Sequence, residues 1–118
     1  MKHNFRKLKI WQDSLELVIK TYKMTKSFPS EEKYGLSSQL NRCSVSIPSN
    51  IAEGSSKSTV KHFKIFLETS LGSAFEWETQ LIVAYRVGYI NKEKFKELEN
   101  NINKIQNMIY TFKNKLSS

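Results

Sequence analysis

Few side chains in this sequence are suited to nucleophilic, acid–base or metal chemistry. The chain has one cysteine, Cys43, and two histidines, His3 and His62. Zinc sites take three or four Cys, His or carboxylate ligands, and a di-iron site in a helical bundle uses Glu-x-x-His motifs, which are absent here. A Cys43–His62 pair would need an orienting third group and an oxyanion site, and the sequence indicates neither. The four glycines are isolated, so a Gly-rich phosphate loop is absent as well. We therefore expect no catalytic residue, no metal and no cofactor.

Basic side chains offer the clearest chemistry, which is the binding of a polyanion. The net charge is +8, of which residues 1–26 contribute +5 and residues 91–118 contribute +3. Such an excess at both ends favours a nucleic acid as partner, ahead of an anionic membrane surface. A solvated basic face that serves only solubility is the alternative. The expected nucleic-acid-binding residues are Lys2, Arg6, Lys7, Lys9, Lys20, Lys23 and Arg42.

Arg42 stands apart from the other basic candidates. It lies between two apolar positions, Leu40 and Cys43, of a predicted helix. Its guanidinium is therefore expected either to pair with Glu53 or Glu76 across a helix seam or to reach a phosphate.

The segment 43–54 interleaves apolar residues with small polar ones around Pro48. In one interpretation its Ser and Asn side chains satisfy carbonyls freed by the proline, or cap a turn that the proline begins. In the other, Asn50 and Glu53 make a polar contact to another subunit or to a ligand. The proline itself either kinks one helix near Ser44 or starts a second short helix.

Apolar residues recur at steps of three and four through most of the chain, which predicts helices. Asn91 is the expected N-cap of the last helix and Ser58 that of the third. Ser30–Lys33 is predicted to form a single turn closed by Gly35. The small residues Ser70, Gly72, Ser73 and Ala74 near the middle of the third helix would let another helix approach closely. The predicted helices span about 8–25, 36–54, 58–87 and 92–116.

These elements predict the fold class. No stretch shows sustained apolar–polar alternation between turn signals, so a sheet has no support. Short connections at 27–35, 55–57 and 88–91 favour an all-α, antiparallel up-down-up-down four-helix bundle. A length of 118 residues fits one domain over 1–118. The aromatic residues either all face one core or partly serve contacts between subunits.

No window of 18 uninterrupted apolar residues is present, and no apolar run follows the first basic residues. We expect no membrane association and a cytoplasmic location.

The sequence also resembles a known family. It is similar to the 23S rRNA intervening-sequence proteins, which are related to the accessory proteins of diversity-generating retroelements. The most specific match is the run Ser46-Ile47-Pro48-Ser49-Asn50-Ile51-Ala52-Glu53-Gly54. Further matches are Phe5-Arg6-Lys7-Leu8, Trp11-Gln12, Phe28-Pro29, Glu32, Tyr34-Gly35-Leu36, Gln39-Leu40, Arg42, Phe63, Phe66-Leu67, Gly72-Ser73-Ala74, Glu76, Gln80-Leu81 and Gly88-Tyr89-Ile90.

The resemblance implies a four-helix bundle that assembles as a ring-shaped homopentamer and has no known enzymatic activity. The retroelement relatives bind nucleic acid and a reverse transcriptase through a basic surface of the ring. The family pattern has two adjacent basic residues where this chain has Asn41-Arg42, and a small alanine where it has Cys43. The family-motif positions with an expected structural or interface role are Trp11, Ser46, Pro48, Asn50, Glu53 and Gly54.

Two hypotheses of function follow. The first is a non-enzymatic, homo-oligomeric protein that binds RNA through a basic surface, with an affinity that falls as salt rises. The second is a homo-oligomeric scaffold that recruits a protein partner, with the net charge serving solubility and no binding of nucleic acid.

Overall fold

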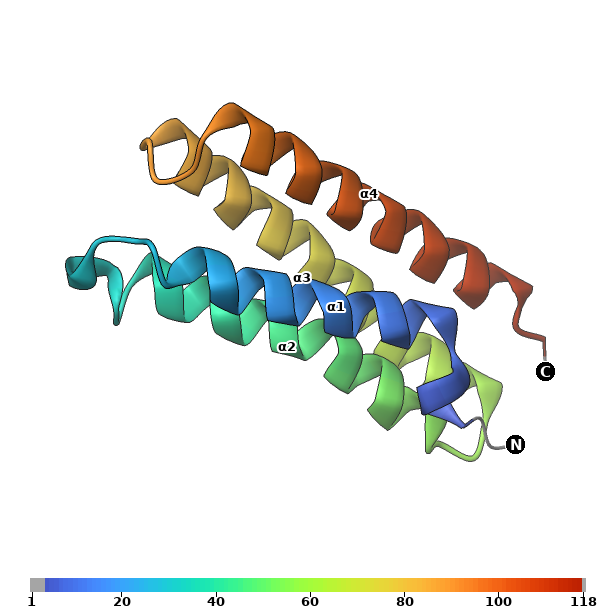
Figure 1. Cartoon of the computed structure of the whole chain (residues 1–118). Helices are drawn as coiled ribbons and strands as arrows, with labels where there is room; N and C mark the ends of the chain where they lie inside the picture. Colours follow the sequence, from blue (N-terminus) through green and yellow to red (C-terminus); the bar gives the residue numbers. More distant parts are fainter. Residues whose placement is uncertain (1–3, 118) are drawn as a thin grey trace.

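The computed structural model describes residues 4–117, and within that range the chain forms four α-helices and no strand. Figure 1 shows the helices packed side by side, with the chain reversing direction at each of the three connections. The predicted all-α bundle is confirmed. The helices are α1 (Lys9–Thr25), α2 (Leu36–Ser55), α3 (Val60–Arg86) and α4 (Lys92–Lys115).

Contacts between helix ends agree with the directions seen in Figure 1. The ring of Phe63, near the start of α3, lies 5.8 Å from that of Phe112, near the end of α4. The ring of Tyr85, near the end of α3, stacks at 4.4 Å on that of Phe95, near the start of α4. Thr25, the last residue of α1, donates a hydrogen bond of 2.9 Å to Asn41 in the second turn of α2. Neighbouring helices are therefore antiparallel.

The apolar stripes predicted from the three–four spacing form one core. Leu40, Ile47 and Ile51 of α2 have no exposed surface, and neither does Trp77 of α3. Phe63 is also buried, whereas Phe75 is 53% exposed. Trp77 and Phe63 thus belong to the core, whereas Phe75, Tyr22, Tyr34 and Tyr110 remain exposed.

The predicted start of the last helix is confirmed, and that of the third is wrong. The Asn91 side-chain oxygen accepts a hydrogen bond of 2.8 Å from the Lys94 N–H, as an N-cap does. In α3 the N-cap is Thr59, which accepts from the His62 N–H, and Ser58 lies one residue before it. The buried stripe begins at Val60, so the cap is the residue directly before Val60.

Pro48 lies inside α2, which continues as one helix to Ser55. Around it, the Ser46 hydroxyl donates to the Cys43 carbonyl at 2.6 Å, and the Asn50 amide donates to the Ser46 carbonyl at 2.8 Å. These polar side chains thus bond to the backbone of their own helix, but the two carbonyls that accept are not the one that the proline frees, which is that of Ser44. A second helix does not begin at the proline.

Close packing of α2 on α3 depends on Gly54. A Cβ atom at this position would lie 2.7 Å from Phe66 Cβ and 2.9 Å from Phe63 Cδ1. The predicted close approach at the small residues of α3 is confirmed at Ser70, but Gly72 takes no part in it, because it is exposed with no heavy atom within 4 Å of such a Cβ. The small residues that do lie in the core of α3 are Ser70 and Ala74, and the Ser70 hydroxyl donates to the Ile47 carbonyl at 2.8 Å.

The connections at one end of the bundle are tied together by Glu32. One of its carboxylate oxygens accepts from the Leu36 N–H at 3.0 Å, and the other accepts from the Tyr89 hydroxyl at 2.8 Å. These two bonds lower the pKa of Glu32. Glu32 ends the predicted turn, which is a 3₁₀ turn at Ser30–Glu32.

Among the helices of the described range, none is long and apolar enough to cross a membrane.

Candidate functional site

The seam between α1 and α4 holds three of the seven basic residues that the sequence analysis singled out, together with lysines of α4. The two helices are antiparallel neighbours, so the basic first quarter of the chain lies beside the basic last quarter. Three hollows follow the seam, and we call them together the α1–α4 groove. The groove therefore brings together lysines from both ends of the chain.

The loop-side hollow lies where α1 ends and α4 begins and has a volume of about 320 Å³. Three of its lining residues are lysines, two from α1 and one from α4. Its lining is Lys20, Lys23, Met24, Ser27, Tyr89, Ile90, Asn91, Lys94 and Leu98.

The central hollow, of about 170 Å³, carries both signs of charge. Asp13 and Glu16 of α1 lie opposite Lys104 of α4. Asp13 also accepts a hydrogen bond of 3.1 Å from Lys9 on its own helix. Glu16 is exposed and has no ion pair within residues 4–117.

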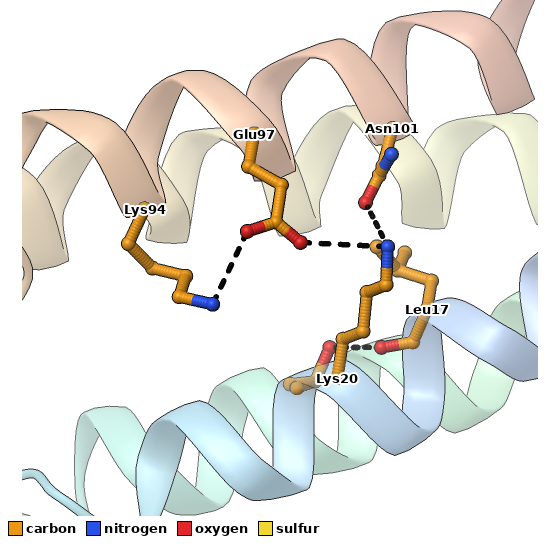
Figure 2. A network of polar contacts seen from close by, with 6 residues as sticks. Leu17, Lys20, Lys94, Glu97 and Asn101 are labelled. Carbon is orange, nitrogen blue, oxygen red and sulfur yellow. Dashed lines mark hydrogen bonds and ion pairs between the residues drawn. The ribbon is translucent and has the colours of Figure 1, made fainter.

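A polar network joins the two helices between the loop-side and central hollows (Figure 2). The Lys20 ammonium donates 2.9 Å to Asn101 Oδ1 and lies 3.5 Å from one carboxylate oxygen of Glu97. The other carboxylate oxygen accepts from Lys94 at 3.2 Å. This hydrogen bond, with the charges of Lys94 and Lys20, lowers the pKa of Glu97. The network holds two of the groove lysines in place and neutralises part of their charge.

The terminal hollow lies where α1 begins and α4 ends and is the largest of the three, at about 560 Å³. Its lining combines apolar residues with three lysines. Lys104 and Lys115 have no ion pair in the described part of the chain. The lining is Leu8, Lys9, Ile10, Lys104, Asn107, Met108, Thr111, Phe112 and Lys115.

The structure brings three of the predicted basic residues, Lys9, Lys20 and Lys23, to the groove. Arg6 and Lys7 are exposed in a 3₁₀ turn at Phe5–Lys7, directly before α1. The seventh candidate, Lys2, lies outside the described residues.

Trp11 of the family motif helps to place the start of α1. Its ring meets the ring of Phe5 edge-on at 5.2 Å, and the Arg6 guanidinium lies 5.8 Å from the Phe5 ring centre. Trp11 is itself half-buried against the core. The side chain thus connects the core with the basic turn.

Arg42 is not part of the basic groove. It is exposed on α2 and lines a different hollow, between α2 and α3, together with Asn50 and Glu76. Within residues 4–117 it has no ion pair, so the expected pairing with Glu53 or Glu76 is wrong. The two helices place both carboxylates beyond ion-pair distance. Glu53 is exposed.

Cys43 has the surroundings of a structural cysteine. It is buried, and its thiol donates to the Ser73 carbonyl at 3.2 Å and lies 3.6 Å from a Glu76 oxygen. Burial, and then the charge of Glu76 and its hydrogen bond, raise the pKa of the thiol to about 12. Its reactive thiolate form is therefore scarce at neutral pH. The ring atom Nδ1 of His62 lies 2.9 Å from the Thr59 hydroxyl oxygen.

The sequence analysis did not single out the α4 lysines that complete the groove: Lys94, Lys104 and Lys115. The charge excess of residues 91–118 was the available signal. Spacing alone did not show that this segment lies beside α1. In the described range, His, Cys, Asp and Glu side chains form no group of three that could hold a metal ion.

Comparison with known proteins places this bundle in a family. The profile described as 23S rRNA-intervening sequence protein matches residues 6–111. The chain belongs to this family. Its fold is similar to that of a solved protein of unknown function from the S23 ribosomal protein family of Bacteroides thetaiotaomicron VPI-5482. That likeness has a TM-score of 0.83 and 25% sequence identity, and covers 90% of this chain and 96% of the other. A comparison with curated proteins gave no match.

Proposed function

We propose that this 23S rRNA-intervening sequence family member is a cytoplasmic, non-enzymatic, oligomeric protein that binds RNA through the α1–α4 groove. One observation carries the proposal. Lysines from both basic ends of the chain line one continuous seam, although they are far apart in the sequence. The description of the family and of the S23 relative gives RNA as the nucleic acid to test first.

The free lysines of the groove are the expected phosphate contacts. Lys23, Lys104 and Lys115 line the groove without an ion pair in the range 4–117, so their charge is available to a ligand. Contacts of this kind supply affinity and orientation but little sequence preference.

The test is the salt dependence of binding to a labelled RNA of mixed sequence, followed by fluorescence anisotropy. The plot of log affinity against log salt should fall with a slope of about −0.7 to −0.9 for each phosphate neutralised. A double variant, Lys23→Glu with Lys115→Glu, should bind at least about tenfold more weakly and flatten the slope by about two.

A matched control removes the same charge elsewhere. Lys61→Glu with Arg86→Glu changes two exposed residues of α3 that do not line the groove. If this control loses as much affinity as the groove variant, only net charge matters and the groove is not the site. Absence of binding at low salt would overturn the RNA proposal.

A second candidate function is that of a scaffold for a protein partner. Apolar side chains remain exposed on α1 (Leu15, Ile19 and Tyr22), on α2 (Val45), on α3 (Ile65, Phe75 and Val83) and at Val87, directly after α3. The α1 residues follow each other at steps of four and three, so they share one face. We propose that these faces join copies of the chain in a homo-oligomer, the homopentamer implied by the family resemblance. In the scaffold function, one of these apolar faces binds a different protein, and salt has little effect on that binding.

A further inference from the structure

Positive charge without a partner is concentrated at the terminal end of the α1–α4 groove. The central hollow is balanced, because two carboxylates and two lysines line it. At the loop end, Lys20 and Lys94 share the carboxylate of Glu97. The lining of the terminal hollow has three lysines and, in the described part of the chain, no carboxylate. A polyanion is therefore attracted most strongly to this end.

Basic side chains lie on both sides of the terminal hollow. Lys104 and Lys115 of α4 have no ion pair within residues 4–117, while Lys9 of α1 is paired on its own helix. The turn at Phe5–Lys7 adds two exposed basic side chains directly before Leu8, which lines the hollow. Phosphates next to the hollow thus meet cations from both helices.

The same hollow also offers apolar surface. Leu8, Met108 and Phe112 are partly buried at the edge of the core, and all three line it. Two exposed α4 side chains in the lining, Asn107 and Thr111, carry hydrogen-bonding groups. The volume of about 560 Å³ falls in the range of about 300–1,000 Å³ that is usual for small-molecule sites.

These three properties together define the chemistry of the ligand. A bare polyanion would use the lysines and leave the apolar surface in water. A nucleotide has a flat, largely apolar base with polar edges, and a phosphate on each side of it. In a duplex the base is stacked and its edge is paired, whereas an unpaired base is free to enter a hollow.

On the basis of the proposed RNA binding, we propose that the terminal hollow takes the base of an unpaired nucleotide, with the neighbouring phosphates on Lys104 and Lys115. Asn107 and Thr111 then lie at the edge of the base. The protein accordingly prefers single-stranded RNA to a duplex of the same sequence.

The first test compares a labelled RNA strand of about ten nucleotides with the same strand annealed to its complement, by fluorescence anisotropy at fixed salt. Wild-type protein should bind the single strand about tenfold more tightly, which is the size of one base held on a protein side chain. Charge alone predicts the opposite order, because the duplex carries twice as many phosphates.

Met108→Gln is the informative variant, since it keeps the length of the side chain and places an amide on the apolar surface. It should weaken binding of the single strand about fivefold. Binding of inorganic polyphosphate, measured by calorimetry, should not change, because polyphosphate has the charge of RNA but no base. Unchanged polyphosphate binding also shows that the variant is folded.

Two controls accompany this variant. Met108→Leu keeps the position apolar and should bind the single strand as the wild type does. Tyr110→Gln places an amide at an exposed position of α4 that lines none of the three hollows, and should also leave binding unchanged.

The outcomes separate this inference from the proposed function. Equal or tighter binding of the duplex would overturn the preference for unpaired RNA while salt-dependent RNA binding stands. Equal loss of RNA and polyphosphate binding in Met108→Gln would overturn the base site. If neither RNA bound at low salt and an amphipathic Leu/Glu helical peptide did, the occupant would be an acidic protein segment, and both proposals would be overturned.

Discussion

At the scale of single residues, Gly54 has the most demanding position in the family motif. Its missing side chain lets Phe63 and Phe66 of α3 contact the α2 backbone. We expect Gly54→Ala to lower the free energy of unfolding by about 1–3 kcal/mol, because the added methyl group overpacks this contact. Urea unfolding at one fixed protein concentration, followed by helical circular dichroism, measures the change.

Gly72 provides the control for the same substitution. It lies in the interior of α3 with open space around it. Gly72→Ala should therefore raise the free energy of unfolding by about 0.5–1 kcal/mol, since it only removes backbone freedom from the unfolded chain. If Gly54→Ala were as stabilising as Gly72→Ala, the close approach of α2 and α3 at Gly54 would be wrong.

At the scale of helices, the start of α4 depends on the cap at Asn91. Its side chain satisfies the Lys94 N–H, which no carbonyl within the helix can reach. Asn91→Ala should cost about 1 kcal/mol of stability. Thermal unfolding detects this loss as a lower midpoint.

Replacing an asparagine inside the same helix by alanine is expected to have no such cost in stability. Asn100 is exposed in α4, and alanine is the better helix former. Asn100→Ala should therefore leave the midpoint equal or slightly raised. Equal losses for the two variants would mean that the cap hydrogen bond contributes nothing.

At the scale of the whole molecule, the exposed apolar faces predict self-association. Leu15, Ile19 and Tyr22 lie on α1, while Ile65 and Val83 lie on α3, so the two apolar surfaces are on different helices. Contact between two different faces is heterologous and closes into a ring when the rotation allows. A pentamer of 13.8 kDa chains would have a mass of about 69 kDa by light scattering.

Charge placed on either face should dissociate the ring. We expect Ile19→Glu and Val83→Glu each to reduce the mass to that of smaller species while helicity is kept. Tyr110→Glu is the control, because Tyr110 is 55% exposed on α4 and belongs to neither face. A monomeric wild-type protein would contradict the ring and leave the bundle intact.

The sequence by itself determined the helices and the class of fold. Apolar steps of three and four need only local geometry to indicate a buried stripe, and most of the predicted stripe residues are buried, with Trp77 and Ile102 fully so. Asn91 was also predictable, because an N-cap bond joins residues three apart. Net charge at the two ends indicated the kind of partner to test for.

Tertiary structure decided which charges share a surface. Arg42 and Lys20 look alike in the sequence, yet the former lies between α2 and α3 and the latter between α1 and α4. Lys94, Lys104 and Lys115 join the groove only because antiparallel packing lays α4 along α1. The same packing places Glu16 of α1 and Lys104 of α4 in one hollow. Such neighbours are separated by most of the chain, and the local spacing of residues carries no information about them.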